Sequence, residues 1–252
     1  MALHSLPLLD VSGVTVRFGG ITALDGISFR VAAGTIAGLI GPNGAGKTTL
    51  FNCLSRLYTF SEGQILFEGT PLTDTAPHGI AQRGIGRTFQ NLALFRTMSV
   101  RHNVMLGGHS RTSSGFLANA LRLPFVRREE DRLGQHADQV IELLDLQGVS
   151  DVPVADLPFG TAKRVELARA LMSQPKLLLL DEPGGGLNHE EVEGLLLLLQ
   201  RIRDELKLTI LLVEHHMNLV MRVSDQVIAL DFGKKIADGT PAEVQVNPDV
   251  VR

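Results

Sequence analysis

The 252-residue sequence predicts an α/β fold that combines a mostly parallel sheet, an N-terminal antiparallel β layer and a helical subdomain. Over residues 176–231, short apolar segments alternate with amphipathic ones, which is typical of parallel strands joined by right-handed crossovers. Ahead of them, residues 99–148 show helical spacing. The composition is 44% hydrophobic, which is sufficient for one large core.

Four short strands are expected in the N-terminal third, where Gly-rich or polar turns separate them. They are the segments 13–19, 26–31, 35–41 and 63–69. Only the segment 35–41 is apolar throughout, so we place it in the buried parallel sheet and the other three in a half-exposed antiparallel layer.

The helical subdomain is expected over residues 93–173, between two parts of one core, 1–92 and 174–252. Its charged stretch, RREEDRLGQHADQVIELLDL, is typical of a solvated helix face, and contact with a partner is the alternative. The elements expected after it are a strand over 176–181, a helix over 189–206, a strand over 209–214, a helix over 215–223 and a strand over 226–231.

Composition excludes several classes of protein. The longest apolar runs are far shorter than the roughly 20 residues that span a bilayer, and the first residues lack the basic region of a signal peptide, so we expect a cytoplasmic protein. The single cysteine, Cys53, excludes an intrachain disulfide and is expected to be a small buried residue. A net charge of -3 provides no basic field for nucleic acid.

A phosphate-binding loop follows the buried strand. The string GPNGAGKTT places Gly41, Gly46, Lys47 and Thr48 at the positions of the P-loop template, between a strand and a helix with Leu50, Leu54 and Leu57 on one face. Lys47 is expected to bridge the β and γ phosphates and Thr48 to bind Mg²⁺. This motif predicts a P-loop NTPase core of the RecA-like type. The residues expected to bind ATP here are Asn43, Gly44, Ala45, Gly46, Lys47, Thr48 and Thr49.

An acidic pair ends the strand LLLLD. Parallel strands deliver such side chains to a bound nucleotide, and neighbouring side chains on a strand alternate in direction. We therefore expect Asp181 to bind Mg²⁺ and Glu182 to activate the attacking water. The alternative is that Glu182 caps a turn before Pro183.

Two further segments carry polar residues that suit a nucleotide site. His215 and His216 follow the strand TILLVE, and a histidine there can donate to a phosphate oxygen. A metal site of Glu214 with the two histidines is the less favoured alternative. Gln90, at the junction of core and helical subdomain, is a candidate for the metal shell, with plain surface as its alternative.

The segment LPFGTAKRVELARAL, residues 157–171, combines a proline-containing turn with an amphipathic helix. Val165, Ala168 and Leu171 are spaced three apart for burial in a core. The turn before the helix is either structural or half of a binding site.

These segments together resemble the ATP-binding cassette (ABC) ATPases, over essentially the whole chain. GGITALDGISF, RTFQNLALFRTMSVRHNVMLG, LPFGTAKRVELARAL, DEPGGGLN, LLVEHHM and DFGKKIADGTPAEV are more specifically similar to the ATPase subunit of branched-chain amino acid importers.

The resemblance implies a role for each matching residue. Phe18 matches the aromatic residue that stacks on adenine, and Gln90 matches the glutamine that senses Mg²⁺ and faces the membrane partner. Glu182 matches the general base, and His215 the histidine that contacts the γ-phosphate. Residues 157–161 match the signature loop that reaches the ATP of an opposite subunit, so Phe159, Gly160 and Thr161 are expected to bind ATP across a head-to-tail dimer.

Three positions depart from the commonest pattern of that family. Pro158 replaces the serine of the Leu-Ser-Gly-Gly-Gln signature, so that binding there is expected to depend on the backbone amides at the helix start. Asn188 and His216 stand where many relatives have aspartate.

We therefore predict an enzyme that hydrolyses ATP with Mg²⁺ at the inner face of the plasma membrane, as part of an importer of branched-chain or related small amino acids or amides. Implied partners are transmembrane permease subunits, a second copy or paralogue of the ATPase, and indirectly a solute-binding protein, without nucleic acid. Alternatives are the ATPase of a lipopolysaccharide or lipid exporter, and a soluble ATPase that acts without a permease.

Overall fold

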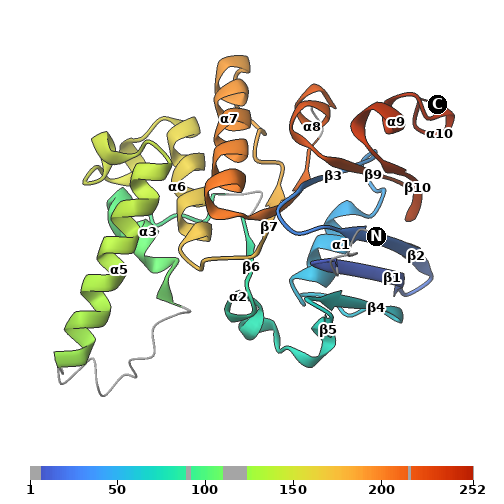
Figure 1. Cartoon of the computed structure of the whole chain (residues 1–252), viewed down its shortest axis with the longest axis horizontal. Coiled ribbons are helices and arrows are strands. Elements are labelled where there is room, and N and C mark those ends of the chain that lie inside the picture. The colour runs from blue at the N-terminus through green and yellow to red at the C-terminus, as the bar shows by residue number, and fades with distance from the viewer. Residues whose placement is uncertain (1–6, 89–91, 110–123, 215–216, 252) are drawn as a thin grey trace, which may run out of the picture. The chain divides into compact units, whose positions relative to one another are not determined.

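The computed structural model describes residues 7–88, 92–109, 124–214 and 217–251 (Figure 1). The chain divides into two compact units, which we call the core unit and the helical unit. The core unit comprises residues 1–87 and 176–252, and the helical unit comprises residues 88–175.

A six-stranded sheet forms the centre of the core unit, with the strand order β10-β9-β3-β8-β7-β6. Strands β6, β7, β8, β3 and β9 pair in parallel, and only β10 is antiparallel to its neighbour, which confirms the predicted mostly parallel sheet. Sequence patterns had indicated neither β6 nor β10, because β6 is a three-residue strand and β10 is largely exposed. The bounds are β3 Ile36–Ile40, β6 Ile85–Arg87, β7 Leu177–Asp181, β8 Thr209–Val213, β9 Gln226–Asp231 and β10 Lys234–Gly239.

The predicted antiparallel layer is a second sheet, with the strand order β2-β1-β4-β5. Strands β1 and β2 begin before the predicted segments, and β1 continues through an irregularity at Gly13, whereas β4 ends two residues earlier than predicted. The bounds are β1 Leu9–Phe18, β2 Ile21–Val31, β4 Glu62–Phe67 and β5 Thr70–Pro71.

Helices cover both faces of the six-stranded sheet (Figure 1). One core joins a face of this sheet to α1 and the antiparallel sheet, and a smaller core joins the other face to α8 and α9. The expected face of α1 is only partly correct, because Leu50 and Leu54 are buried whereas Leu57 lies beyond the helix end and is exposed. The helices are α1 Lys47–Leu54, α2 Ile80–Arg83, α7 His189–Leu206, α8 Met217–Val223, α9 Pro241–Gln245 and α10 Pro248–Val251, with the short 3₁₀ turns η1 Leu72–Asp74 and η2 Pro77–Gly79.

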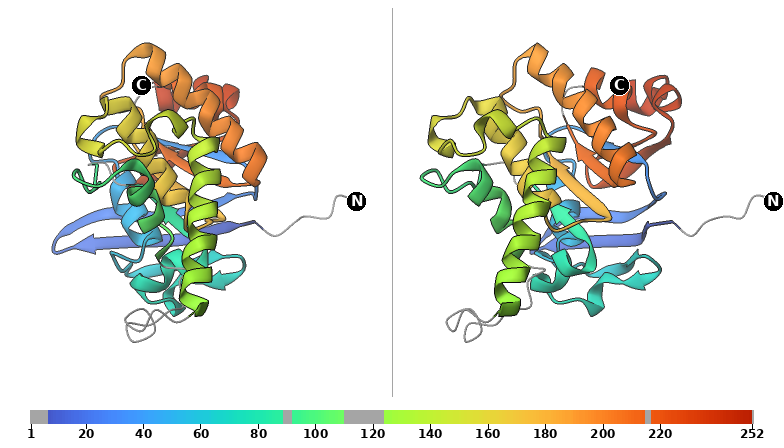
Figure 2. Two further views of the ribbon diagram at one scale, coloured as in Figure 1. Left: turned by 90° about the vertical axis from the view of Figure 1, so that its left-hand side faces the viewer. Right: turned by 60° about the vertical axis from the view of Figure 1, so that its left-hand side comes forward.

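The helical unit is built on α6, Phe159–Leu171, which packs against α3, Val100–Leu106, and α5, Pro124–Leu143 (Figure 2). Val165, Ala168 and Leu171 are buried, as their spacing predicted. The charged residues early in α5 are mostly exposed, as both the solvated face and the alternative of a partner contact require. The 3₁₀ turns η4 Gln147–Val149 and η5 Val154–Asp156 lead back towards α6.

Among the described residues, every helix is too short or too polar to cross a membrane.

Candidate active site

The loop between β3 and α1 has the backbone that phosphate binding requires. Gly41, Gly44 and Gly46 all have positive φ. A Cβ at Gly41 would lie 2.2 Å from the carbonyl oxygen of Leu230, and one at Gly46 would lie 2.6 Å from the side chain of Leu24, so both positions require glycine. No side chain caps the start of α1. The amides at the start of this helix are therefore free of side-chain competition for an anion.

The side chain of Lys47 folds back over this loop. Its Nζ donates to the carbonyl oxygens of Gly41 at 2.6 Å and Pro42 at 2.9 Å. Burial lowers the pKa of Lys47, and the nearby carboxylates of Glu182 and Asp181 oppose that shift. The lysine thus lies within electrostatic reach of both members of the acidic pair, and a phosphate oxygen would be a stronger acceptor than either carbonyl.

The two acids of the pair have different surroundings. Asp181 ends β7 and is buried, and burial raises the pKa of its carboxyl, an effect that Arg87 opposes. Glu182 follows the strand with a left-handed φ of 50°, and its amide donates to the carbonyl oxygen of Val213 at 2.9 Å. The Glu182 carbonyl accepts from Gly185 at 3.0 Å, so its backbone does belong to a turn. The turn is formed by main-chain hydrogen bonds. The proposed role of the Glu182 side chain in activating water is therefore still a prediction.

Sequence analysis missed Arg87, the last residue of β6. Its guanidinium donates to Asp181 Oδ2 at 3.2 Å. It also donates to Asn52 Oδ1 in α1 at 2.8 Å and to Oγ of Ser55, the residue after the helix, at 3.2 Å. It also lies over the ring of Phe51, 5.7 Å from the centroid. Arg87 thereby connects the helix after the phosphate loop to the strand that carries the acidic pair. The available signal was its position just ahead of the TFQN segment.

Phe18 lies at the end of β1, where its ring is 47% exposed and meets Tyr58 edge to face at a centroid distance of 5.2 Å. An exposed ring suits the predicted stacking on adenine, which stays a prediction. Gln90, His215 and His216 lie outside the described residues, and so does the alternative metal site with Glu214.

In the helical unit, Pro158 is the N-cap residue of α6 and provides no side-chain hydrogen bond. The helical ladder starts with the amide of Ala162, which donates to the Pro158 carbonyl at 3.0 Å, so the amides of residues 159–161 precede it. Phe159 is 48% exposed, with Lys163 Nζ 5.6 Å from its ring centroid.

In the core unit, Asn188 is another position that departs from the commonest family pattern, and it caps α7. Its Oδ1 accepts from the Glu191 amide at 3.0 Å, and its own amide donates to Glu191 Oε2 at 2.9 Å.

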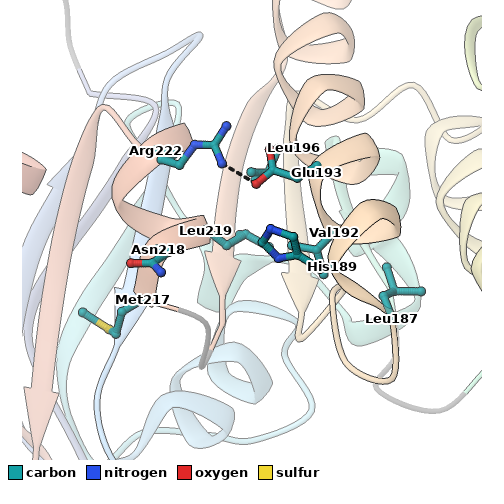
Figure 3. Close-up of a pocket in the computed structure, with 9 residues that line it drawn as sticks. All are labelled: Leu187, His189, Val192, Glu193, Leu196, Met217, Asn218, Leu219 and Arg222. Carbon is teal, nitrogen blue, oxygen red and sulfur yellow. Dashed lines mark hydrogen bonds and ion pairs between the residues drawn. The ribbon is translucent and has the colours of Figure 1, made fainter.

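A pocket of about 530 Å³ lies between α7 and α8 (Figure 3). An ion pair between Arg222 and Glu193 crosses it, and Leu187, from the loop that follows the acidic pair, lies at its edge. This pocket is separate from the phosphate loop, none of whose residues line it.

The residues of the phosphate loop and the acidic pair, all in the core unit, fit a nucleoside triphosphate with a divalent cation. Gly41 and Gly46 leave no room for a side chain within the loop, and the helix start and Lys47 provide positive charge for phosphates. The Thr48 hydroxyl and the Asp181 carboxylate are hard oxygen donors, which Mg²⁺ prefers.

Comparison with known proteins agrees with this chemistry. Residues 24–185 match the family described as ABC transporter, and residues 234–252 match the family described as branched-chain amino acid ATP-binding cassette transporter. The chain is 40% identical to the high-affinity branched-chain amino acid transport ATP-binding protein BraF of Pseudomonas aeruginosa, over 98% of this chain and 97% of that protein. It is 39% identical to LivG of Escherichia coli, which has the same description, over the same shares.

Solved structures agree in fold. An ATP-binding cassette of an ABC transporter in its ADP conformation superposes with a TM-score of 0.84 at 29% identity, and the match covers 98% of each chain. A nucleotide-free ATP-binding cassette gives the same values.

Proposed function

The chain belongs to the ABC transporter family as one of its ATP-hydrolysing, nucleotide-binding subunits, and on this premise we propose that it drives the import of branched-chain amino acids. The observation that supports this substrate class is the match of residues 234–252 to the branched-chain family, together with near full-length similarity to BraF and LivG. Related small amino acids or amides are included in the proposal.

Hydrolysis would use residues of the core unit in distinct roles. The loop amides and Lys47 bind the phosphates, and Thr48 and Asp181, with Gln90, hold Mg²⁺. When bound, the cation neutralises charge on the β and γ phosphates. Glu182 accepts a proton from the attacking water, whose oxygen bonds to the γ-phosphorus as the bond to the ADP oxygen breaks. His215 contacts the γ-phosphate that leaves as inorganic phosphate.

Transport requires more chains than this one. The family implies transmembrane permease partners, and we place the ATPase against them at the inner face of the plasma membrane. A second ATPase subunit, identical or paralogous, would supply residues 159–161 to the ATP held by the first. A solute-binding protein would deliver the substrate to the permease.

Replacing Glu182 with glutamine tests the assignment of the general base. We expect Glu182→Gln to lower the rate of ATP hydrolysis by about a hundredfold or more, because the amide accepts no proton, while affinity for MgATP is retained. Phosphate release and nucleotide affinity would both be measured. Glu190→Gln, at an exposed acid in the first turn of α7, is the matched control and should hydrolyse ATP normally. Hydrolysis at the wild-type rate by Glu182→Gln would refute the assignment.

The substrate proposal is tested separately, in vesicles that contain the chain with candidate permease subunits and a solute-binding protein. We expect ATP-dependent uptake of leucine, isoleucine or valine. Uptake of other solutes alone, or movement of lipid instead of amino acid, would contradict the proposed substrate without affecting the ATPase assignment.

A further inference from the structure

Glu214 is a buried carboxylate that has no role in the mechanism above. It follows β8 directly and is only 2% exposed. Ionisable side chains are almost never this buried unless they are partnered, because the loss of hydration must be offset. Glu214 Oε1 accepts a hydrogen bond from the backbone amide of Gly184 at 2.5 Å. Gly184 lies in the loop that follows the acidic pair.

That loop is attached twice to the end of β8. At its start, the amide of Glu182 donates to the carbonyl oxygen of Val213 at 2.9 Å, and two residues later Gly184 donates to Glu214. Within the loop, the amide of Leu187 donates to the Gly184 carbonyl at 3.1 Å. The hydrogen bond from the Gly184 amide therefore fixes the middle of the loop to the Glu214 carboxylate.

The left-handed backbone of Glu182 needs such support. A non-glycine residue at φ 50° is in a sparsely populated conformation that persists only where surrounding contacts hold it. The amide of Glu182 itself bonds to Val213, and the amide two residues later bonds to Glu214. The direction of the Glu182 side chain depends on this backbone conformation.

The contact between residue 184 and Glu214 leaves no space for a side chain at position 184. A Cβ at Gly184 would lie 2.8 Å from Glu214 Oε1 and 3.4 Å from a methyl group of Leu219. A side chain there would displace either the carboxylate or the loop. The Gly184 amide and the Glu214 carboxyl are thus in direct contact, which leaves no space for a side chain between them.

We propose that Glu214 is a positioning residue for ATP hydrolysis. Its carboxylate accepts the hydrogen bond of the Gly184 amide and thereby holds the loop after Glu182 in the conformation that directs this base. The inference rests on the proposed role of Glu182 and extends it to a residue that would act through the loop backbone.

Kinetics of three variants of the full chain test this inference. Glu214→Ala should lower kcat for ATP hydrolysis about tenfold or more, because small displacements of a catalytic group have large effects on rate. Its KM and its affinity for MgATP should be unchanged, since the phosphate loop is untouched. Glu214→Gln retains an acceptor oxygen and should recover most of the rate. Gly184→Ala should reproduce the loss of kcat with Glu214 still present, and this variant decides the test if Glu214→Ala does not fold.

Amide exchange and a control variant separate positioning from stability. Exchange should accelerate across residues 184–187 in Glu214→Ala. Glu243→Ala removes another carboxylate that accepts a backbone amide, that of Thr240 at 2.8 Å, and should keep the wild-type kcat. Wild-type kcat in both Glu214→Ala and Gly184→Ala would overturn the inference, as would a loss of MgATP affinity that parallels a loss of thermal stability. If Glu182→Gln is fully active, the assignment of the base fails whatever Glu214 does.

Discussion

Around the phosphate loop, buried ionisable side chains lie near side chains of opposite charge. Burial lowers the pKa of Lys47 and raises that of Asp181, and each is opposed by charged neighbours. Arg87 pairs with Asp181 through an ion pair in which the Asp181 side chain is buried and the Arg87 side chain is 12% exposed. Removing one partner of such a pair leaves an uncompensated charge, so Arg87 and Asp181 depend on each other in the ligand-free protein. A bound phosphate and cation would supply further partners to Lys47 and Asp181.

Cys53 shows the effect of burial without an ionic partner. Its side chain is completely buried in α1, and burial raises the pKa of the thiol from 9.0 to about 11. We expect the native protein to be unreactive towards Ellman's reagent at pH 8, and to react with one equivalent after unfolding, because the thiolate is the nucleophile. Rapid reaction of the folded protein would contradict the burial.

The same shift predicts a dependence of stability on pH. Because the folded pKa lies above the unfolded value, the contribution of Cys53 is fully present below pH 9 and is lost as the pH rises towards 11. The loss approaches about 2 to 3 kcal/mol of unfolding free energy. Urea unfolding of wild type and Cys53→Ala between pH 8 and 10.5 checks this, and the wild type should lose more stability over that range than the variant.

At the scale of elements, close helix packing shapes the helical unit. Gly107 ends α3 against α6, and a Cβ there would lie 1.9 Å from the carbonyl oxygen of Arg169. The two helices approach to a distance that no side chain at this position allows.

The start of α7 is stabilised by a complete capping box, which Asn188 and Glu191 form. Asparagine at position 188, where many relatives have aspartate, therefore preserves the cap.

Gly107→Ala should therefore destabilise the protein by about 1 to 3 kcal/mol, because the added methyl group forces α3 away from α6. Gly148→Ala is the matched control, since a Cβ at this exposed glycine meets no atom within 4 Å and its φ is not left-handed. Urea unfolding of the two variants measures the difference. Equal stability of both would show that α3 and α6 yield without strain.

At the scale of the whole molecule, the residues that we propose to bind ATP belong to both units. The phosphate loop and the acidic pair belong to the core unit, and residues 157–161 belong to the helical unit. Under the proposed function, residues 157–161 of a second subunit would complete the ATP site of the first. Pro158 offers neither a hydroxyl nor an amide donor, so binding across the dimer would rely on the amides of residues 159–161.

Gly160→Asp tests that arrangement. A carboxylate facing phosphate should abolish ATP hydrolysis by repulsion, while ATP binding by the monomer, which uses the phosphate loop, stays intact. Gly148→Asp introduces the same charge at an exposed glycine of the same unit and should leave hydrolysis unchanged. Hydrolysis and monomer nucleotide affinity are the two measurements. Loss of monomer binding in Gly160→Asp would mean that the loop has a structural role.

Sequence patterns were sufficient for the parts of this protein whose signals are local. The glycine spacing of residues 41–46, the apolar strand before Asp181 and the helical periodicity of Val165, Ala168 and Leu171 each lie within one short segment. Local backbone preference and side-chain periodicity explain why such segments reveal their structure. Even there the end of α1 was misjudged at Leu57, because helix ends depend on tertiary contacts.

Contacts between distant segments had no such signal. Arg87 and Asp181 are 94 positions apart, and Glu214 and Gly184 are 30 apart, yet each pair forms a hydrogen bond because parallel strands bring their carboxyl ends to one edge of the sheet. The sequence alone thus indicated the family, and it predicted the phosphate loop and the acidic pair as its site. The folded chain added the partners that hold those residues, since strand order and the left-handed backbone at Glu182 arise from the packing of the whole core unit.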